Sequence, residues 1–309
     1  MSTGFVFPGQ GSQSVGMCNA LADVFPVVKE TFAEASDALG FDLWTLVSNG
    51  PDSELNKTEN TQPAMLTAGV ATWRVWQQQG GAIPAMMAGH SLGEYSALVC
   101  ADALNLTDAV TLVADRGRYM QAAVAEGEGA MAAILGLDDD AVRQACTDAA
   151  QGDVVEAVNF NAPGQVVIAG RSAAVQRATE LAKSAGAKRA VLLPVSVPSH
   201  CALMMPAAEK LATRLADINI LTPSIPVINN VDVASADNTD AIKDALVRQL
   251  HNPVRWVETI QSMASQGVNK LIECGPGKVL VGLNKRIARD MTALPVIDSE
   301  TLNAALADE

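Results

Sequence analysis

The chain has 309 residues, of which 49% are hydrophobic and 18% are charged, and its formal net charge at pH 7 is −13. This composition supports a sizeable core and excludes a chain that is disordered throughout. Because binding to nucleic acids needs a basic face, the acidic balance argues against nucleic-acid partners. The five cysteines are scattered without a C-x-x-C pair, so we expect neither a disulfide framework nor a metal site. A reducing compartment, the cytoplasm, fits this cysteine usage.

Segments that would direct the chain to a membrane are not predicted. The first residues, MSTGFVFPGQG, lack a basic region and a long apolar region, so we expect no signal peptide. The uncharged stretch over residues 75–93 contains three consecutive glutamines, a pair of glycines and Pro84, which do not suit a membrane-spanning helix. We therefore expect no membrane partner.

The first part of the chain is predicted to alternate between strands and helices. Residues 4–7 predict a strand that leads into a glycine-rich loop, and residues 25–39 and 61–79 predict helices. Met17 and Cys18 stand where a phosphate-binding loop requires Lys and Ser or Thr, so this loop is not a P-loop. It either presents main-chain N–H groups to an oxyanion or is a plain turn.

A G-x-S-x-G motif at residues 89–93 lies between a short apolar run at residues 85–88 and a predicted helix at residues 94–101. In this strand–turn–helix setting the motif raises a serine above the edge of a sheet. Ser91 is therefore a candidate nucleophile. The main-chain N–H of Leu92, at a helix N-terminus, is a candidate oxyanion donor. The alternative is an ordinary glycine-containing loop between a strand and a helix.

Residues 106–124 predict a helix with one apolar stripe. At about 100° per residue, Arg116 falls within roughly 60° of the centre of that stripe, whereas Arg118 lies on the polar face. Arg116 is therefore expected to point inward, where a guanidinium needs an anionic partner. That partner is either a bound anion or an internal Asp or Glu, and the sequence does not decide between these two interpretations.

After Glu128 the order of predicted elements becomes strand, helix, strand, strand, helix, strand, which is typical of a small ferredoxin-like unit. The predicted strands of this unit are residues 130–135, 154–158, 166–169 and 189–195, and its predicted helices are residues 139–150 and 173–185. The longer α/β rhythm then resumes, with strands at 226–230 and 270–273 and helices at 240–250, 254–266 and 278–289. We therefore expect the small unit to be an insertion in a larger α/β fold.

His200 is a candidate general base for Ser91. It follows a predicted strand and precedes a predicted helix, and catalytic groups often lie on such loops. A lone histidine is more often structural, but a serine nucleophile needs a base. A rival triad of Ser91, Asp232 and His251 has the chain order of α/β-hydrolases. Against it, His251 does not follow a strand, and the sequence has no H-G-G-G oxyanion motif.

Several segments together resemble malonyl-CoA:acyl carrier protein transacylase, and they occur in the order that this family shows. They are Phe7-Pro8-Gly9-Gln10-Gly11-Ser12-Gln13, Thr61-Gln62-Pro63-Ala64, Gly89-His90-Ser91-Leu92-Gly93-Glu94, Arg116-Gly117, Asn159-Phe160-Asn161-Ala162-Pro163-Gly164-Gln165 and Gly275-Pro276-Gly277. With nothing left over, the chain is similar to the free-standing bacterial enzyme of fatty-acid synthesis rather than to a module of a megasynthase. Ala162 departs from the family, where serine is common.

The resemblance implies an α/β fold in which an α/β-hydrolase-like subdomain, residues 1–127 and 197–309, carries an inserted ferredoxin-like subdomain, residues 128–196. It implies Ser91 as the nucleophile and His200 as the base. The other site residues that it implies are the N–H groups of Gln10 and Leu92 as the oxyanion hole, Arg116 as the clamp on the malonyl carboxylate, Gln62, Asn159 and Asn161 as pocket lining, and a main-chain carbonyl near Gln249 that orients the histidine.

The implied reaction moves a malonyl group from CoA to the phosphopantetheine thiol of acyl carrier protein through a malonyl-serine intermediate. The CoA thioester is a substrate, so we expect no cofactor and no metal, and the expected partners are malonyl-CoA and acyl carrier protein. We expect a cytoplasmic monomer. Two other classes stay open: a serine esterase that uses Asp232 and His251, and a carrier-protein-binding module that forms no acyl-enzyme.

Overall fold

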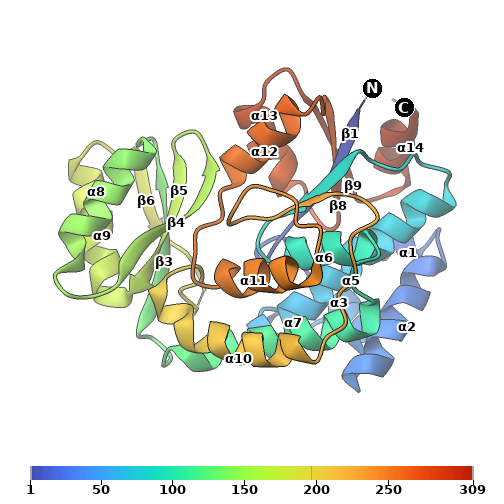
Figure 1. The fold of residues 1–309 in the computed structure, drawn as a ribbon, viewed down its shortest axis with the longest axis horizontal. Helices are drawn as coiled ribbons and strands as arrows, with labels where there is room; N and C mark the ends of the chain where they lie inside the picture. Colours follow the sequence, from blue (N-terminus) through green and yellow to red (C-terminus); the bar gives the residue numbers. More distant parts are fainter. Residues whose placement is uncertain (1, 196, 308–309) are drawn as a thin grey trace.

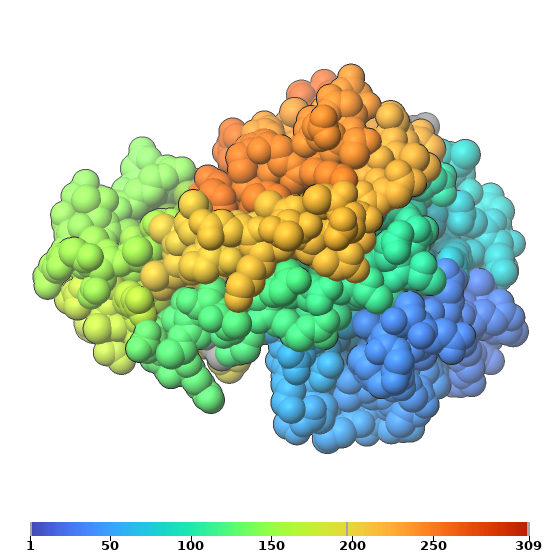
Figure 2. Space-filling model, turned by 60° about the horizontal axis from the view of Figure 1, so that its bottom comes forward, coloured from blue at the N-terminus to red at the C-terminus, as the bar shows by residue number. Residues whose placement is uncertain are grey.

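The computed structural model describes residues 2–195 and 197–307. These residues form two separate β-sheets, one with five strands and one with four. Figure 1 places the smaller sheet in a lobe at the left, together with α8 (Asp139–Ala150) and α9 (Ser172–Ser184), and the larger sheet in the body at the right. Figure 2 shows the same lobe, green to yellow, projecting from the body of the molecule. The fold is mixed α/β, as predicted.

The larger sheet is parallel and has the strand order β7-β2-β1-β8-β9. Alternate residues of a strand face opposite sides of the sheet, and here the side chains on both sides are buried. Phe5 and Phe7 pack against the helices of one face, whereas Val6 packs against the helices of the other. The strands are β1 (Thr3–Phe7), β2 (Met86–Gly89), β7 (Val227–Ile228), β8 (Lys270–Cys274) and β9 (Thr292–Val296).

Helices cover both faces of the larger sheet, as a buried parallel sheet requires. The side chains of Asn105 and Asn238 begin two of these helices by accepting a hydrogen bond from an N–H of the first turn. The face of Phe5 and Phe7 is covered by α2 (Val27–Leu39), α5 (Thr58–Gln78), α6 (Gly93–Cys100), α7 (Leu106–Ala123), α10 (Met205–Ala216) and α11 (Thr239–Gln249). The opposite face is covered by α12 (Trp256–Ser265) and α13 (Val279–Ile287).

The smaller sheet is antiparallel, with the strand order β4-β5-β3-β6. On one face, α8 and α9 enclose an apolar core that includes Ile134, Ile168 and Val175. The other face carries Met131 and Val167 and packs against Cys201 of the body. The strands are β3 (Gly129–Leu135), β4 (Val155–Ala162), β5 (Gln165–Arg171) and β6 (Arg189–Leu192). The predicted order of strands and helices in this part of the chain is therefore correct.

Some predicted bounds are wrong. The strand expected over residues 189–195 ends at Leu192, because Pro194 has no N–H to donate to a neighbouring strand. The elements that were not predicted are α1 (Asn19–Ala22), α3 (Leu43–Asn49), α4 (Asp52–Leu55), the 3-10 helix η1 (Ala202–Met204), β9 and α14 (Ser299–Ala307). Positions 1, 196, 308 and 309, which the expected division of the chain includes, lie outside the described residues. In the described part of the chain, no helix combines the length and apolarity that a membrane crossing requires.

Candidate active site

Ser91 lies on a sharp turn between β2 and α6. Its backbone φ is 52°, in the left-handed region that non-glycine residues seldom adopt. The turn leaves no room for a side chain at Gly89, where a Cβ would lie 1.8 Å from the carbonyl carbon of Gly93. The main-chain N–H of Ser91 donates to Asn230 Oδ1 at 2.7 Å, which ties the turn to the end of β7. The motif therefore forms the strained elbow that exposes a serine hydroxyl, and Ser91 lines a cavity.

His200 is the hydrogen-bond partner of Ser91. Ser91 Oγ and His200 Nε2 lie 2.8 Å apart, and His200 Nδ1 lies 2.7 Å from the main-chain oxygen of Gln249. Because a carbonyl oxygen only accepts, Nδ1 carries the ring proton and Nε2 presents its lone pair to the Ser91 hydroxyl. As predicted, His200 lies in the connection between a strand and a helix: β6 ends at Leu192, α10 begins at Met205, and His200 sits in a turn with φ 68°.

The surroundings keep His200 neutral. The residue is 3% exposed, and burial together with the nearby charge of Arg116 lowers its pKa to about 3. A neutral imidazole is the form that accepts a proton, so the ring is in its basic form at neutral pH. A negative charge beside Arg116 would offset the guanidinium and raise the pKa of His200, which would make the ring a stronger base.

Arg116 of α7 points into the same cavity, as its helix phase predicts, and is 1% exposed. Its Nη1 donates to Gln62 Oε1 at 2.9 Å, and its Nη2 donates to Gln249 Oε1 at 3.1 Å. The same Nη2 lies 3.4 Å from Ser91 Oγ. Among the described residues no carboxylate pairs with this guanidinium, and its Nε has no acceptor. A buried cation without a counter-ion is suited to an anionic group of a ligand.

Gln10 and Leu92 line the same cavity as Ser91. Within the described residues, neither main-chain N–H donates to a protein acceptor. They lie close because β1 and β2 are parallel neighbours, so the segments after them leave the same edge of the sheet. The loop after β1 also approaches closely through Gly9, where a Cβ would lie 2.5 Å from His90 O. Two free donors beside a serine hydroxyl can stabilise an oxyanion.

Two asparagines of β4 reach the cavity from the smaller sheet. Asn159 and Asn161 both line it, and Asn161 Oδ1 lies 2.8 Å from His90 Nε2. Gln62, which was predicted to line the pocket, instead lies behind Arg116. Its Oε1 accepts from the guanidinium, and its Nε2 donates to Met120 Sδ at 3.3 Å. Gln62 can therefore orient Arg116 but does not form part of the cavity wall.

The cavity around Ser91 has a volume of about 200 Å³ and lies where the two sheets meet. The larger sheet supplies the loops that carry Ser91 and Gln10. The smaller sheet and the segment after it supply the apolar wall, which consists of Met131, Val167, Leu193, Val195 and Val197. The site thus combines polar groups around Ser91 with an apolar wall.

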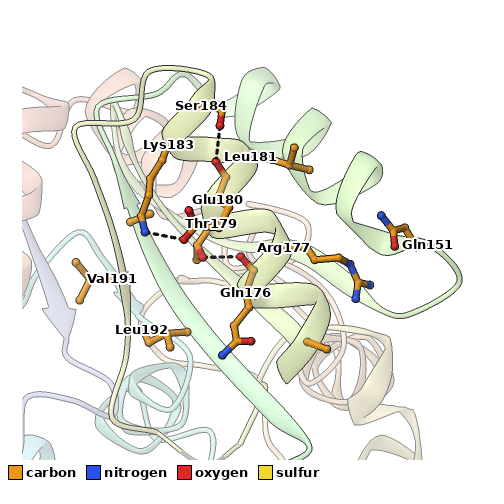
Figure 3. A pocket seen from close by; sticks show the side chains of 12 residues that line it. Gln151, Gln176, Arg177, Thr179, Glu180, Leu181, Lys183, Ser184, Val191 and Leu192 are labelled. Atoms are coloured by element: carbon orange, nitrogen blue, oxygen red, sulfur yellow. Dashed lines mark hydrogen bonds and ion pairs between the residues drawn. The ribbon is translucent and has the colours of Figure 1, made fainter.

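A second and larger hollow, of about 1110 Å³, lies between α9 and β6 (Figure 3). It shares no lining residue with the Ser91 cavity. Its polar side chains are engaged in structural contacts: Lys183 pairs with Glu180, Ser184 Oγ donates to the main-chain oxygen of Glu180, and Arg177 donates to Asp153 and to two main-chain oxygens at the end of α8. Because none of its lining residues forms a pair of nucleophile and base, we place the candidate active site at the Ser91 cavity.

Three polar side chains of the site were not predicted. Asn230 accepts from the Ser91 N–H, and Glu94 Oε2 accepts from Gln249 Nε2 at 2.8 Å. Gln249 was expected to act through its main chain alone, but its Nε2 also donates to Ser91 O at 3.1 Å. The available signals were the position of Glu94 beside the G-x-S-x-G motif and that of Asn230 at the end of a predicted strand.

The rival triad of Ser91, Asp232 and His251 is not assembled. Arg248 holds the Asp232 carboxylate with two hydrogen bonds of 2.9 and 2.7 Å and lowers its pKa. His251 Nδ1 lies 3.1 Å from Asn252 Nδ2 instead. In the part of the chain that is described, no group of three or more His, Cys, Asp or Glu side chains is placed to hold a metal ion.

Comparison with known proteins agrees with this geometry. Residues 4–299 match the acyl transferase domain family. The chain is 63% identical to the malonyl CoA-acyl carrier protein transacylase of Escherichia coli (strain K12) over 302 residues, which cover 98% of each chain. It is 46% identical to the protein of the same name from Bacillus subtilis (strain 168), covering 98% of this chain and 95% of the relative.

Two solved structures have nearly the same fold. One is an acyl carrier protein S-malonyltransferase from Vibrio cholerae, with a TM-score of 0.97, 60% identity, and 98% and 99% of the two chains covered. The other is a malonyl-transacylase in complex with a type II PKS acyl-carrier protein, with a TM-score of 0.99, 58% identity and full coverage of both chains. The chain therefore belongs to the acyl transferase domain family and, within it, to the malonyl-CoA:acyl carrier protein transacylases.

Proposed function

We propose that this chain is a malonyltransferase that moves a malonyl group from CoA to the phosphopantetheine thiol of acyl carrier protein, in fatty-acid synthesis. One observation carries the proposal: the Ser91–His200 pair shares a cavity with Arg116, a buried cation that has no counter-ion among the described residues. A serine esterase would need the pair but not the guanidinium. The names of the E. coli and B. subtilis relatives support the same activity.

In the first half-reaction, the Ser91 oxygen bonds to the thioester carbonyl carbon while its proton passes to His200 Nε2. The carbonyl electron pair moves onto oxygen, where the N–H groups of Gln10 and Leu92 stabilise the charge. The intermediate then collapses, the carbon–sulfur bond breaks, and His200 returns the proton to the sulfur of CoA. A malonyl ester remains on Ser91.

The second half-reaction runs the same steps with the carrier thiol as the attacking group. His200 Nε2 takes the thiol proton as sulfur bonds to the ester carbonyl carbon, and the same oxyanion donors stabilise the intermediate. The ester carbon–oxygen bond breaks, and the proton passes from His200 to the Ser91 oxygen. The Gln249 carbonyl holds the ring in the required tautomer throughout, in the place where other serine enzymes use a carboxylate.

Arg116 binds the free carboxylate of the malonyl group in this proposal. Guanidinium and carboxylate form two parallel charge-assisted hydrogen bonds, and the unpartnered Nε offers a donor for this purpose. Gln62 and Gln249 orient the guanidinium through their oxygens. Asn159 and Asn161 line the pocket beside the acyl group. The carboxylate would also offset the charge that lowers the pKa of His200.

We also propose the organisation around the site. The elbow at Ser91 supports an α/β-hydrolase-like subdomain over residues 1–127 and 197–309. The strand order β4-β5-β3-β6 with two helices on one face supports a ferredoxin-like subdomain over residues 128–196. The five free cysteines support a cytoplasmic setting, and we propose that the chain acts as a monomer that needs no cofactor.

Intact-mass measurement after incubation with malonyl-CoA, followed by peptide mapping, tests the proposed function. The protein should gain the mass of one malonyl group, located on Ser91. The Ser91→Ala variant should remain folded, as judged by its melting temperature, and gain none. An adduct on another residue, or no adduct on the parent protein, would contradict the proposal; the second outcome would favour a carrier-protein-binding module.

A further inference from the structure

Glu94 is a buried carboxyl that the proposed reaction does not use. It lies in the first turn of α6, three residues after Ser91, and is 2% exposed. One of its oxygens, Oε2, accepts two hydrogen bonds: from Gln249 Nε2 at 2.8 Å and from the main-chain N–H of Asn230 at 2.9 Å. Both donors belong to residues that also contact Ser91. A single oxygen atom therefore holds two neighbours of the nucleophile.

The bond to Gln249 decides which way its side-chain amide faces. Arg116 can only donate, so Gln249 must present Oε1 to the guanidinium, as it does at 3.1 Å. Its Nε2 must then face acceptors, which are Ser91 O and Glu94 Oε2. If Glu94 offered no acceptor at this point, the amide would lose half of the bonding that keeps its oxygen toward Arg116.

The bond to Asn230 acts on the other side of the nucleophile. The side-chain oxygen of Asn230 accepts from the Ser91 N–H at 2.7 Å, and its Nδ2 donates to Gly89 O at 2.7 Å. These two contacts hold the elbow at Gly89 and at Ser91. Glu94 anchors the backbone from which this side chain projects. Burial raises the pKa of Glu94 to about 7, and the neutral form of the acid keeps an oxygen that can accept both bonds.

We propose that Glu94 is a positioning residue whose Oε2 atom fixes Gln249 and Asn230, and through them the orientation of Arg116 and Ser91. The inference rests on the proposed function for its substrate, since the orientation of Arg116 matters for a malonyl carboxylate. The required property is an acceptor at one point in space rather than a negative charge. Substitutions that separate these two properties therefore provide the test.

Two conservative variants make that separation. Glu94→Gln removes the charge but keeps an oxygen at the same reach, whereas Glu94→Asp keeps the charge and withdraws the oxygen by one methylene. We expect Glu94→Gln to stay within about threefold of the parent kcat/KM for malonyl transfer. We expect Glu94→Asp to lose about tenfold or more, because a buried donor is left unsatisfied, and to lose part of its preference for malonyl over acetyl. Glu94→Ser should show the same loss if the aspartate variant does not fold.

Glu273 supplies the matched control. It is also fully buried, and its oxygens accept from the main-chain N–H groups of Leu280 and Val281, away from the Ser91 cavity. Glu273→Asp should lower the melting temperature without changing the malonyl-to-acetyl preference. Parent-like kinetics in Glu94→Asp would reduce Glu94 to a structural role and overturn the proposal. A larger loss in Glu94→Gln than in Glu94→Asp would also overturn it, since charge would then be the required property.

The rate at which a fluorophosphonate labels Ser91 separates this inference from the proposed function. The reagent has no carboxylate and needs no carrier protein. A parent protein that reacts with it but takes no malonyl group would contradict the proposed function alone. The positioning inference would still require Glu94→Asp to label at least about threefold more slowly than Glu94→Gln, because the elbow and its base would be less well held. Equal labelling rates would overturn it.

Discussion

The interior around Ser91 and the interior of the smaller sheet under its helices differ in how many polar side chains they bury. Around Ser91, beside the apolar wall of the cavity, several buried side chains are polar: Glu94, Arg116, His200, Asn230 and Gln249. Under α8 and α9, the buried side chains of the smaller sheet are apolar, with Ile134, Ile168 and Val175 among them. The chain thus contains one interior that suits packing and another that suits chemistry.

The difference shows what each interior contributes. Apolar burial stabilises the fold in proportion to the area removed from water and needs no partner atoms. Buried polar groups are costly unless each one is hydrogen-bonded, and around Ser91 nearly every donor finds an acceptor. The exceptions in the described part of that region are Arg116 Nε, Tyr95 Oη and the main-chain N–H groups of Gln10 and Leu92. The guanidinium and the two main-chain N–H groups are the donors that the proposed reaction uses.

The largest effect is expected from His200, the proposed base for Ser91. His200→Ala should lower the rate of Ser91 acylation roughly 10²- to 10⁴-fold, because the hydroxyl would lose its proton acceptor. Single-turnover measurements of malonyl-enzyme formation test this. His251→Ala and Asp232→Asn are the controls and should keep most of the activity, since neither residue contacts Ser91 in the described structure. The reverse order of effects would support the rival triad.

Arg116→Ala comes next. Truncating one member of a buried charge pair costs about 2–5 kcal/mol, so kcat/KM for malonyl transfer should fall by roughly thirty- to several-thousand-fold. Acetyl-CoA has no carboxylate and should be transferred no worse than by the parent, so the preference should swing from malonyl toward acetyl. Parallel losses for both substrates, together with a lower melting temperature, would mean that the guanidinium serves the fold.

The sequence allows prediction of the polar interior only where one local segment contains the signal. Ser91 is marked by its motif, and Arg116 by the phase of its helix. The contact of Asn230 depends on β7 pairing with β2, and those of the Gln249 side chain depend on where the end of α11 packs; local periodicity reveals neither. Gln62 was predicted to line the cavity but lies behind Arg116. Its position depends on how α5 packs against α7, which the local sequence does not reveal.

Prediction of the fold from the sequence is limited in the same way. Long amphipathic helices and short apolar strands were predicted within a few residues, since their periodicity is local. The bounds of α8 were predicted correctly, with Asp138 capping its first turn. The strand β9 was missed because it is short, lies at the edge of the sheet and contains Pro295, which propensity alone assigns to a loop. Its place beside β8 is decided by tertiary packing.

Glu273 is a buried carboxyl outside the Ser91 cavity, so it shows how burial of such a group affects the stability of the fold alone. Burial raises its pKa from 4.5 to about 7, so the folded state keeps this proton up to a higher pH than the unfolded state does. Its contribution to stability is fully present below pH 4.5 and is lost as the pH rises through 7. The difference between the unfolded and folded pKa values corresponds to a change in the free energy of unfolding on the order of 3 kcal/mol.

Thermal unfolding at pH 5 and pH 8 checks this. Glu273→Gln does not titrate, so the stability of the parent relative to the variant should fall between the two pH values. Glu94 has a similarly raised pKa but is present in both proteins, so its contribution cancels. A parent and variant with equal pH dependence would show that Glu273 is ionised in the folded state.

The smallest expected effects come from two neighbours on β5 that face the two interiors. Ile168 packs in the apolar core under α8 and α9, whereas Val167 lines the Ser91 cavity. Ile168→Val should lower the free energy of unfolding by about 0.5–1.5 kcal/mol, because it removes one buried methylene, and should leave kcat/KM for malonyl transfer unchanged.

Val167→Ile adds one methylene to the wall of the Ser91 cavity, which has a volume of about 200 Å³. It should lower kcat/KM by up to roughly tenfold through a higher KM, with little change in melting temperature. Steady-state kinetics and thermal unfolding of both variants test the pair. If Ile168→Val altered the kinetics as much as Val167→Ile, the two faces of the smaller sheet would not be independent, and the division between a packing interior and a chemical interior would be wrong.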